Sequence, residues 1–109
     1  MSDPFETELI RAAKKDFKSL RSWTADILRH LAHLEVNPNA GHTLSGSLHG
    51  CRSLEFNLKG SGAFRAVYVI DVERERCVAL VIAPHENVYR EAERRILALR
   101  KSGEIPPLA

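Results

Sequence analysis

The fold is decided by residues 58–95, which read LKGSGAFRAVYVIDVERERCVALVIAPHENVYREAERR. Two runs of apolar and β-branched residues, at positions 64–71 and 77–82, lie on either side of a charged segment at 72–76. This pattern predicts a β-hairpin whose turn is longer than the tightest type. Both runs are almost entirely apolar, which is typical of central strands in a sheet that is covered on both faces.

After this hairpin, the spacing of the apolar residues changes from a strand period to a helix period. The residues that recur at helical spacing are Val88, Ala92, Ile96 and Leu99. We therefore expect an amphipathic helix, with Pro84 near its first position and the acidic Glu86 in its first turn. The helix should end at residues 101–103, where a lysine precedes a serine and a glycine.

The part of the chain before the hairpin predicts one strand and two helices. Residues 5–11 alternate weakly between apolar and polar and are interpreted as a first strand. Residues 12–20 carry an apolar face with lysines largely away from it, and a second apolar stripe occupies residues 23–34. Two helices joined by a short turn form a helical hairpin. Breaker residues at 37–41 end the second helix, and residues 42–50 are expected to form an ordered loop.

A further strand is predicted at residues 52–59, where one face carries Arg52, Leu54, Phe56 and Leu58. The expected fold is therefore α+β: an N-terminal strand, a helical hairpin, a three-stranded antiparallel meander and a C-terminal helix. A single domain should span residues 1–109, with residues 103–109 as a short flexible tail. The helical hairpin is expected to cover one face of the sheet and to leave the opposite face as the working surface.

The composition is ordinary for a globular protein, at 44% hydrophobic and 28% charged residues. A net charge of +2 over 109 residues does not by itself indicate a nucleic-acid-binding protein. Two cysteines are too few for a disulfide scaffold, and the N-terminus carries no signal-peptide pattern. No apolar run approaches the roughly 20 residues that a membrane span needs. These features predict a soluble, cytoplasmic protein that does not bind a membrane.

Metal-free RNA cleavage is one chemistry that the sequence can support. Attack by the substrate's own 2′-hydroxyl needs a base, an acid for the leaving 5′-oxygen and positive charge on the phosphate. Basic and titratable side chains stand at predicted strand ends and at the start of the final helix: Arg52, Lys59, Arg65, His85, Tyr89 and Arg90. His85 and Tyr89 share a helix face if the helix already includes His85.

Each of these residues also has an ordinary structural explanation. Exposed positions at a sheet edge suit Arg52 and Lys59, where cations keep a protein soluble. An ion pair with Glu55 or Asp71 would account for Arg65. Half-buried packing would account for the tyrosine of the final helix.

A metal site and a plain macromolecular binding surface are two other classes of site that these residue types can form. The five histidines and two cysteines form neither a CxxC nor an HExxH pattern, so no metal and no cofactor are predicted. A plain binding module stays open as an alternative, because basic residues line the predicted helices. They are Lys14, Lys15, Lys18, Arg21, Arg29, Arg94, Arg95, Arg100 and Lys101.

Four short motifs follow one another along the chain. They are Asn37-Pro38, a Leu-x-Gly-x-Leu-x-Gly-x-Arg-Ser pattern at residues 44–53, LKGSGAFRAVY at residues 58–68 and PHENVYREAERR at residues 84–95. Together they resemble toxins of the RelE/ParE superfamily, which belong to type II toxin–antitoxin operons of bacteria and their mobile elements. The similarity extends from the first strand through the final helix, and the expected order of elements is that of the family's compact α/β fold.

The resemblance implies one of two activities. RelE-like members are metal-independent endoribonucleases (mRNA interferases) that cut messenger RNA in the ribosomal A site, inhibit translation and leave 2′,3′-cyclic phosphate ends. ParE-like members inhibit DNA gyrase instead. A non-catalytic interaction module of the same fold is the third possibility. The expected partners are a cognate antitoxin in a hetero-oligomer, together with the ribosome and mRNA or, in the alternative, DNA gyrase.

The motifs also imply roles for individual residues. Lys59 resembles a sheet lysine of the nuclease branch, Arg65 its central arginine and Tyr89 its helix tyrosine. Nuclease members often carry a Lys- and Arg-rich segment before the final helix, where this chain reads APHE at residues 83–86. His85 could replace the missing arginine as acid or base, since imidazole titrates near neutrality. The candidates for binding substrate phosphates are Arg52 and Arg90.

The three functional classes differ in what they require of the surface. In a nuclease, one concave patch should contain five side chains: Arg52, Lys59, Arg65, His85 and Tyr89. A gyrase inhibitor needs no such cluster, and an interaction module should show an apolar groove instead.

Overall fold

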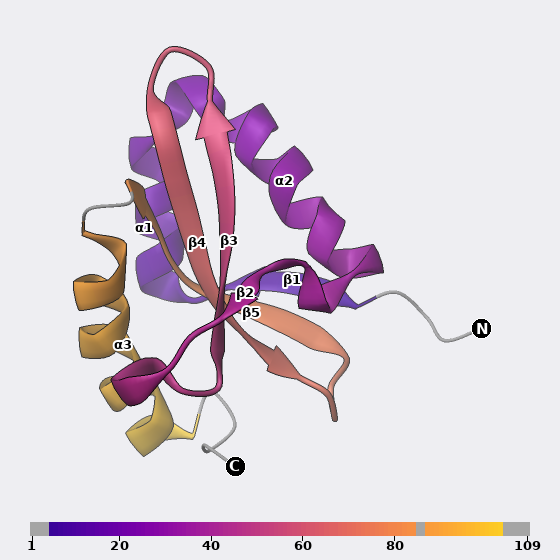
Figure 1. Ribbon diagram of the computed structural model, residues 1–109, viewed down its shortest axis with the longest axis vertical. Coiled ribbons are helices and arrows are strands. Elements are labelled where there is room, and N and C mark those ends of the chain that lie inside the picture. The colour runs from indigo at the N-terminus through magenta and orange to yellow at the C-terminus, as the bar shows by residue number, and fades with distance from the viewer. Residues whose placement is uncertain (1–4, 85–86, 104–109) are drawn as a thin grey trace.

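The computed structural model describes residues 5–84 and 87–103. Within these residues, a five-stranded sheet in the order β1-β5-β4-β3-β2 has three α-helices packed around it (Figure 1). The α-helices are α1 (Arg11–Ser19), α2 (Thr24–Val36) and α3 (Val88–Ser102), and the short 3-10 helices are η1 (Arg21–Trp23), η2 (Pro38–Ala40) and η3 (Gly46–Leu48). The strands are β1 (Glu6–Leu9), β2 (His42–Thr43), β3 (Cys51–Leu58), β4 (Gly62–Asp71) and β5 (Arg76–Pro84). The predicted α+β fold and the order of its main elements are confirmed.

The predicted meander forms the centre of the sheet. β3, β4 and β5 pair antiparallel, and β1 joins the far side of β5 in parallel. At the other edge β2 adds a two-residue strand to β3. This strand lies in the segment that was predicted to be a loop, because two residues are too few to show a period in the sequence.

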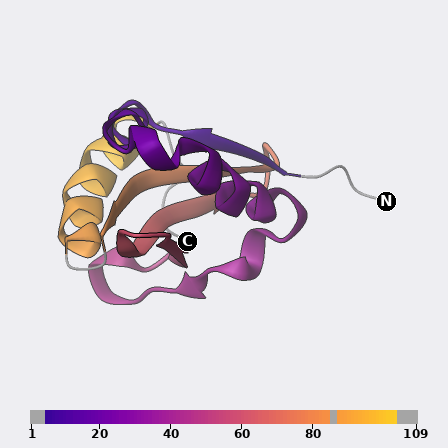
Figure 2. The ribbon, with the colours of Figure 1, turned by 90° about the horizontal axis from the view of Figure 1, so that it is seen from above.

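Each face of the sheet has its own apolar core. Figure 2 shows α1 and α2 on one side of the sheet. There α2 packs on alternate residues of β3 and β4, among them Phe56, Phe64 and Tyr68. On the opposite face α3 buries its apolar stripe against β4 and β5. Because this stripe needs a surface to cover it, α3 occupies part of the face that was expected to be the working surface.

The junction between β5 and α3 differs from the prediction. Pro84 is the last residue of β5, where it pairs with Phe64, and it does not start the helix. A proline at a strand end is tolerated, because its missing N–H leaves no ladder bond unmade in the middle of the sheet. The helix begins at Val88, and the expected face shared with His85 cannot be examined, because residues 85 and 86 lie outside the described residues.

The far end of α3 follows the prediction. Gly103 adopts a left-handed conformation with φ of 76°, and its N–H donates to the carbonyl oxygens of Leu99 and Arg100. Glycine is favoured at this position because it has no Cβ to oppose the positive φ. The predicted tail lies outside the described residues from residue 104 onward. None of the helices in the described part of the chain is long and apolar enough to cross a membrane.

Candidate functional site

The β3–β4 pair places a cation and a carboxylate side by side. Glu55 lies directly opposite Arg65 in the ladder, so both side chains project from the same face of the sheet. The Arg65 Nη2 donates to the Glu55 Oε2 at 2.9 Å. The Arg65 side chain is 19% exposed and the Glu55 side chain 50%. The arginine side chain is therefore mostly buried, while the carboxylate is open to solvent.

Helix α3 brings Tyr89 onto this pair. Tyr89 lies in the first turn of the helix, and its phenol oxygen accepts a hydrogen bond from the Arg65 Nη1. The Arg65 Cζ lies 5.4 Å from the centroid of the tyrosine ring, within the range of a cation–π contact. The tyrosine hydroxyl also lies 3.5 Å from the Oγ of Ser53, a buried residue of β3. We call Ser53, Glu55, Arg65 and Tyr89 the Arg65 cluster.

The guanidinium of Arg65 has more N–H donors than its hydrogen bonds to Glu55 and Tyr89 use. An arginine side chain has five N–H donors. One bond goes to Glu55 and another to Tyr89, while the buried Nε finds no acceptor among the described residues. A buried donor left without an acceptor costs about 1–3 kcal/mol. Because the Nε is buried, an acceptor that arrives from solvent does not reach this donor.

The Arg65 cluster combines three chemical groups that metal-free phosphoryl chemistry uses. A carboxylate can take a proton, a guanidinium can stabilise negative charge on a phosphate, and a phenol can give a proton. From the sequence, Glu55 is expected only as an ordinary ion-pair partner of Arg65. The structure shows that ion pair, whereas Asp71 binds Arg76 instead, at 3.0 Å. The Lys59–Ser61 turn sets the register that brings the pair together, and sequence alternation alone does not give that register.

Arg52 lies on the other face of the sheet. Its Nε donates to the carbonyl oxygen of Gly41 at 3.1 Å, and its Nη2 to that of Asn39 at 3.4 Å. Neighbouring residues of a strand point to opposite faces, so Arg52 and Ser53 cannot serve one patch. The structure therefore does not gather all five expected residues together.

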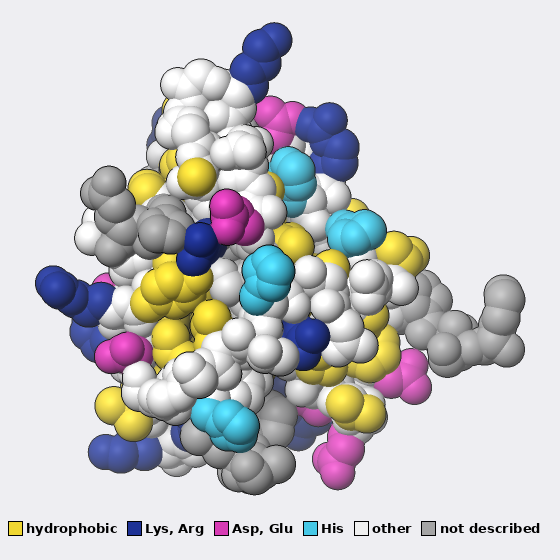
Figure 3. All heavy atoms as spheres, viewed as in Figure 1, with side chains coloured by type: hydrophobic (Ala, Val, Ile, Leu, Met, Phe, Trp, Pro, Cys, Tyr) yellow, Lys and Arg dark blue, Asp and Glu magenta, His cyan; other side chains and the backbone are white. Residues whose placement is uncertain are grey.

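The remaining candidates lie around the Arg65 cluster. Lys59 is exposed in the turn after β3, roughly 14 Å along the strand from Glu55, and its carbonyl oxygen accepts a hydrogen bond from the Trp23 Nε1 at 3.1 Å. Arg90 is exposed on α3 next to the tyrosine. His85 lies outside the described residues. In Figure 3, Lys and Arg side chains are spread among acidic and histidine side chains, without one basic patch on this view of the surface.

A hollow of about 410 Å³ lies near the β2 edge, and its lining does not include the Arg65 cluster. It is lined by Thr43, Leu44, His49, Gly50, Cys51, Arg52 and Ile70. Burial raises the pKa of the Cys51 thiol to about 11, so that the thiol is protonated near neutral pH and is a poor nucleophile. No group of three or more His, Cys, Asp or Glu side chains in the described ranges could hold a metal ion.

Comparisons with known proteins identify the fold. No protein-family model matches the sequence, and no curated protein matches it. The chain superposes on a mutant of the Escherichia coli toxin RelE in the free state with a TM-score of 0.67 and 23% identity, covering 85% of this chain and 98% of that one. The toxin–antitoxin complex RelBE2 from Mycobacterium tuberculosis gives 0.65 and 24%, covering 75% and 99%. The isolated E. coli RelE toxin gives 0.57 and 22%, covering 84% and 98%. The chain thus has the fold of the RelE toxins.

Proposed function

We propose that this protein is the toxin of a type II toxin–antitoxin pair and that it cleaves messenger RNA on the ribosome without a metal ion. The shared fold supports the toxin role, since several of the similar structures are RelE toxins or their complexes with antitoxin. The observation that carries the cleavage proposal is the contact of Arg65 with both Glu55 and Tyr89. The Glu55 carboxylate, the Arg65 guanidinium and the Tyr89 hydroxyl lie together at this contact.

In the first step Glu55 takes the proton from the 2′-hydroxyl of the substrate RNA. The 2′-oxygen then attacks the adjacent phosphorus, and negative charge builds up on the phosphate oxygens. Arg65 turns from the carboxylate to these oxygens, where its charge is worth most. The exposed position of Glu55 lets the RNA backbone approach it from solvent.

In the second step the bond from phosphorus to the 5′-oxygen breaks, and that oxygen needs a proton. Tyr89 or His85 supplies the proton. The products are a 2′,3′-cyclic phosphate and a 5′-hydroxyl. Lys59 and Arg90 contact phosphates on either side of the cleaved bond, and Arg52, on the other face, contacts more distant RNA.

The partners follow from the same proposal. The outer face of α1 is a row of exposed cations: Arg11, Lys14, Lys15 and Lys18. Such a row attracts the phosphate backbone of ribosomal RNA. A cognate antitoxin would cover the Arg65 cluster with acidic and apolar residues, which complement Arg65, the exposed Arg90 and the apolar surface of α3.

The test is brief induction of the chain in bacteria that lack the antitoxin, followed by 5′-end mapping of cellular RNA. We expect new ends inside translated messages, which disappear in Arg65→Ala and Tyr89→Phe. Arg94→Ala, at an exposed arginine of α3, is the matched control and should keep them. A folded Arg65→Ala protein that still produces these ends would overturn the cleavage mechanism.

The same experiment separates the alternatives. Growth arrest with intact messages and lost DNA supercoiling would indicate a gyrase inhibitor. An absence of arrest, from a folded protein that binds a partner, would indicate an interaction module. Either result would contradict the proposed nuclease.

A further inference from the structure

Strand β1 is too short to protect the whole edge of β5. Its parallel pairing ends at Leu9 opposite Ala79, and the chain turns into α1 after Ile10 donates to the Ala79 carbonyl oxygen at 3.1 Å. The register between β4 and β5 shifts next to this point and leaves Leu80 without a ladder partner, and the carbonyl of Leu80 and the N–H of Ile82 bond side chains instead. A strand edge that lies beneath helices needs partners for these groups, because water cannot supply them.

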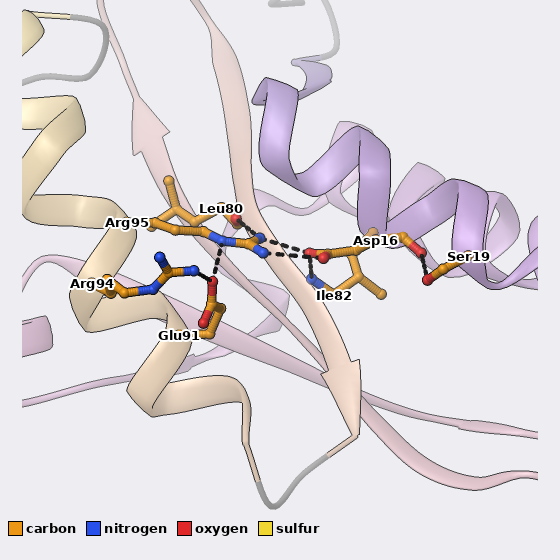
Figure 4. Close-up of polar contacts among 7 residues, drawn as sticks. All are labelled: Asp16, Ser19, Leu80, Ile82, Glu91, Arg94 and Arg95. Atoms are coloured by element: carbon orange, nitrogen blue, oxygen red, sulfur yellow. Dashed lines mark hydrogen bonds and ion pairs between the residues drawn. The ribbon is translucent and has the colours of Figure 1, made fainter.

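Beyond the end of β1, two side chains bind the edge of β5, as Figure 4 shows. The Asp16 Oδ2, from α1, accepts the Ile82 N–H at 3.1 Å. The Arg95 Nη1, from α3, donates to the Leu80 carbonyl oxygen at 2.8 Å. The two side chains also bind each other, with contacts of 2.7 and 3.1 Å. We call Asp16 and Arg95 the edge pair.

The edge pair is largely removed from solvent and is itself fixed. Its side chains are 20% exposed for Asp16 and 14% for Arg95. One turn earlier on α3, Glu91 accepts from the Arg95 Nε at 3.0 Å. The guanidinium therefore binds its own helix, the sheet edge and α1 at once. Two parallel bonds between a guanidinium and a carboxylate define an orientation as well as a distance.

The position of Arg95 on α3 relates it to the candidate site. With about 3.6 residues per turn, Tyr89 and Arg95 fall on opposite flanks of the apolar stripe of this helix. Tyr89 contacts β4 and β3 on one flank, and Arg95 contacts the β5 edge and α1 on the other. The hydrophobic effect is non-directional, so burial of the stripe does not alone define the exact roll of the helix. Directional bonds on the second flank oppose that roll.

We propose that Asp16 and Arg95 are positioning residues that fix the roll of α3 and so hold Tyr89 on Arg65. As a statement about catalysis, this inference rests on the proposed nuclease function. The structural part, that the edge pair fixes the roll of α3, is independent of that function. The edge pair binds Leu80, Ile82 and Glu91, so its effect on the chemistry passes through the helix.

The structural part is tested by NMR of protein labelled with ¹³C in the tyrosine rings. The chain has two tyrosines, Tyr68 and Tyr89, and Tyr89→Phe assigns their signals. Asp16→Asn removes the negative charge of the edge pair but keeps the shape of the side chain. We expect the Tyr89 signals to shift or broaden and those of Tyr68, on the other face, to stay in place. Asp26→Asn, in an exposed ion pair of α2, is the matched control and should move neither.

Unchanged Tyr89 signals in Asp16→Asn would overturn the proposal. Movement of both tyrosines to random-coil positions would mean that this variant has unfolded. The same criterion then applies to Arg95→Lys, which keeps the charge but cannot bind Glu91, Leu80 and Asp16 together. Asp16→Glu keeps the carboxylate and should restore the Tyr89 signals in part.

Cleavage kinetics test the catalytic part. In Asp16→Asn we expect kcat on programmed ribosomes to fall on the order of ten- to a hundredfold, with KM unchanged, because a misplaced group slows the chemical step and not binding. A moved Tyr89 signal with full kcat would overturn the catalytic part alone. If the wild-type protein cuts no RNA, the proposed function fails, and the NMR result still decides whether the edge pair positions the helix.

Discussion

Two arginine–tyrosine groups lie on opposite faces of the same sheet and are bonded in different ways. On the α2 face, Tyr68 is fully buried, donates to the Pro38 carbonyl oxygen at 2.6 Å and accepts the Gly41 N–H at 2.9 Å. Arg52 beside it donates to backbone carbonyls. On the α3 face, Arg65 and Tyr89 bind each other and the side chains of Ser53 and Glu55.

This difference separates a structural role from a chemical one. The hydrogen bonds of Tyr68 and Arg52 to backbone hold a loop on the sheet. If these side chains bound a substrate instead, the loop would lose its attachment. Burial also raises the pKa of Tyr68, so its phenol stays protonated. Bonds among side chains around a half-exposed carboxylate can be exchanged for bonds to a substrate. Residue type alone would rank the two groups equally, and their partners distinguish them.

The largest expected effect is that of Glu55→Gln. This change keeps the size of the side chain but removes the base, so cleavage should fall by about 10²–10⁴-fold. The unfolding free energy should change by less than about 1 kcal/mol, since the carboxylate is half exposed. Cleavage assays on programmed ribosomes and urea denaturation check the two expectations. Glu93→Gln, at an exposed position of α3, is the control, and equal losses in both variants would argue against Glu55 as base.

The comparison is sharpest in the two Tyr→Phe variants. Tyr68→Phe leaves the Gly41 N–H and the Pro38 carbonyl without their partner, so we expect it to lower the unfolding free energy by about 1–3 kcal/mol. Tyr89→Phe should lower stability less and cleavage more. Urea denaturation and cleavage rates of both variants test whether Tyr68→Phe lowers mainly stability and Tyr89→Phe mainly cleavage. Parallel losses in both assays would mean that the two faces do not differ in role.

Much of the fold could be predicted, because most elements are long enough to show a period. The meander and the final helix followed from such runs, while β2, with two residues, did not. Pro84 was assigned to the helix because proline suits both a first helical turn and a strand end, and only the pairing with Phe64 decides between them.

The candidate site could be predicted only in part. Alternation along β3 already placed Arg52 on the face of Leu54 and Phe56, apart from Ser53 and Glu55. Choosing candidates by residue type alone combined the two faces. The contact of Arg65 with Tyr89 joins positions 24 residues apart, and it depends on how α3 packs across the sheet.

A further effect on stability, without loss of cleavage, is expected from Gly41→Ala, at the loop that Tyr68 binds. A Cβ at Gly41 would lie 2.8 Å from the Ser53 carbonyl oxygen and equally close to the Tyr68 ring and hydroxyl. The backbone and the buried ring cannot both give way, so we expect a loss of about 1–3 kcal/mol in unfolding free energy. Cleavage per folded molecule should be unchanged, as thermal melts and single-turnover rates together would show. A fall in that rate would mean that the two faces are coupled.

The smallest effect concerns pH and again belongs to the α2 face. His30 stacks on Phe56, with ring centroids 4.8 Å apart. Burial, and next the charge of Arg29, lowers the pKa of His30 below its ordinary value of 6.5. The unfolded chain then binds a proton at a higher pH than the folded one, so stability should decrease as the pH falls through 6.5 toward the lower folded pKa.

His30→Phe keeps the ring stack but removes the titration, so its stability should depend less on pH between 7.5 and 5.5 than that of the wild type. His33→Gln, on the exposed side of the same helix, is the control. Urea midpoints across this pH range measure the difference. The pH profile of cleavage should be the same in His30→Phe and wild type, because His30 lies on the face of the sheet opposite the Arg65 cluster. A shifted cleavage profile would show that protonation on one face reaches the chemistry on the other.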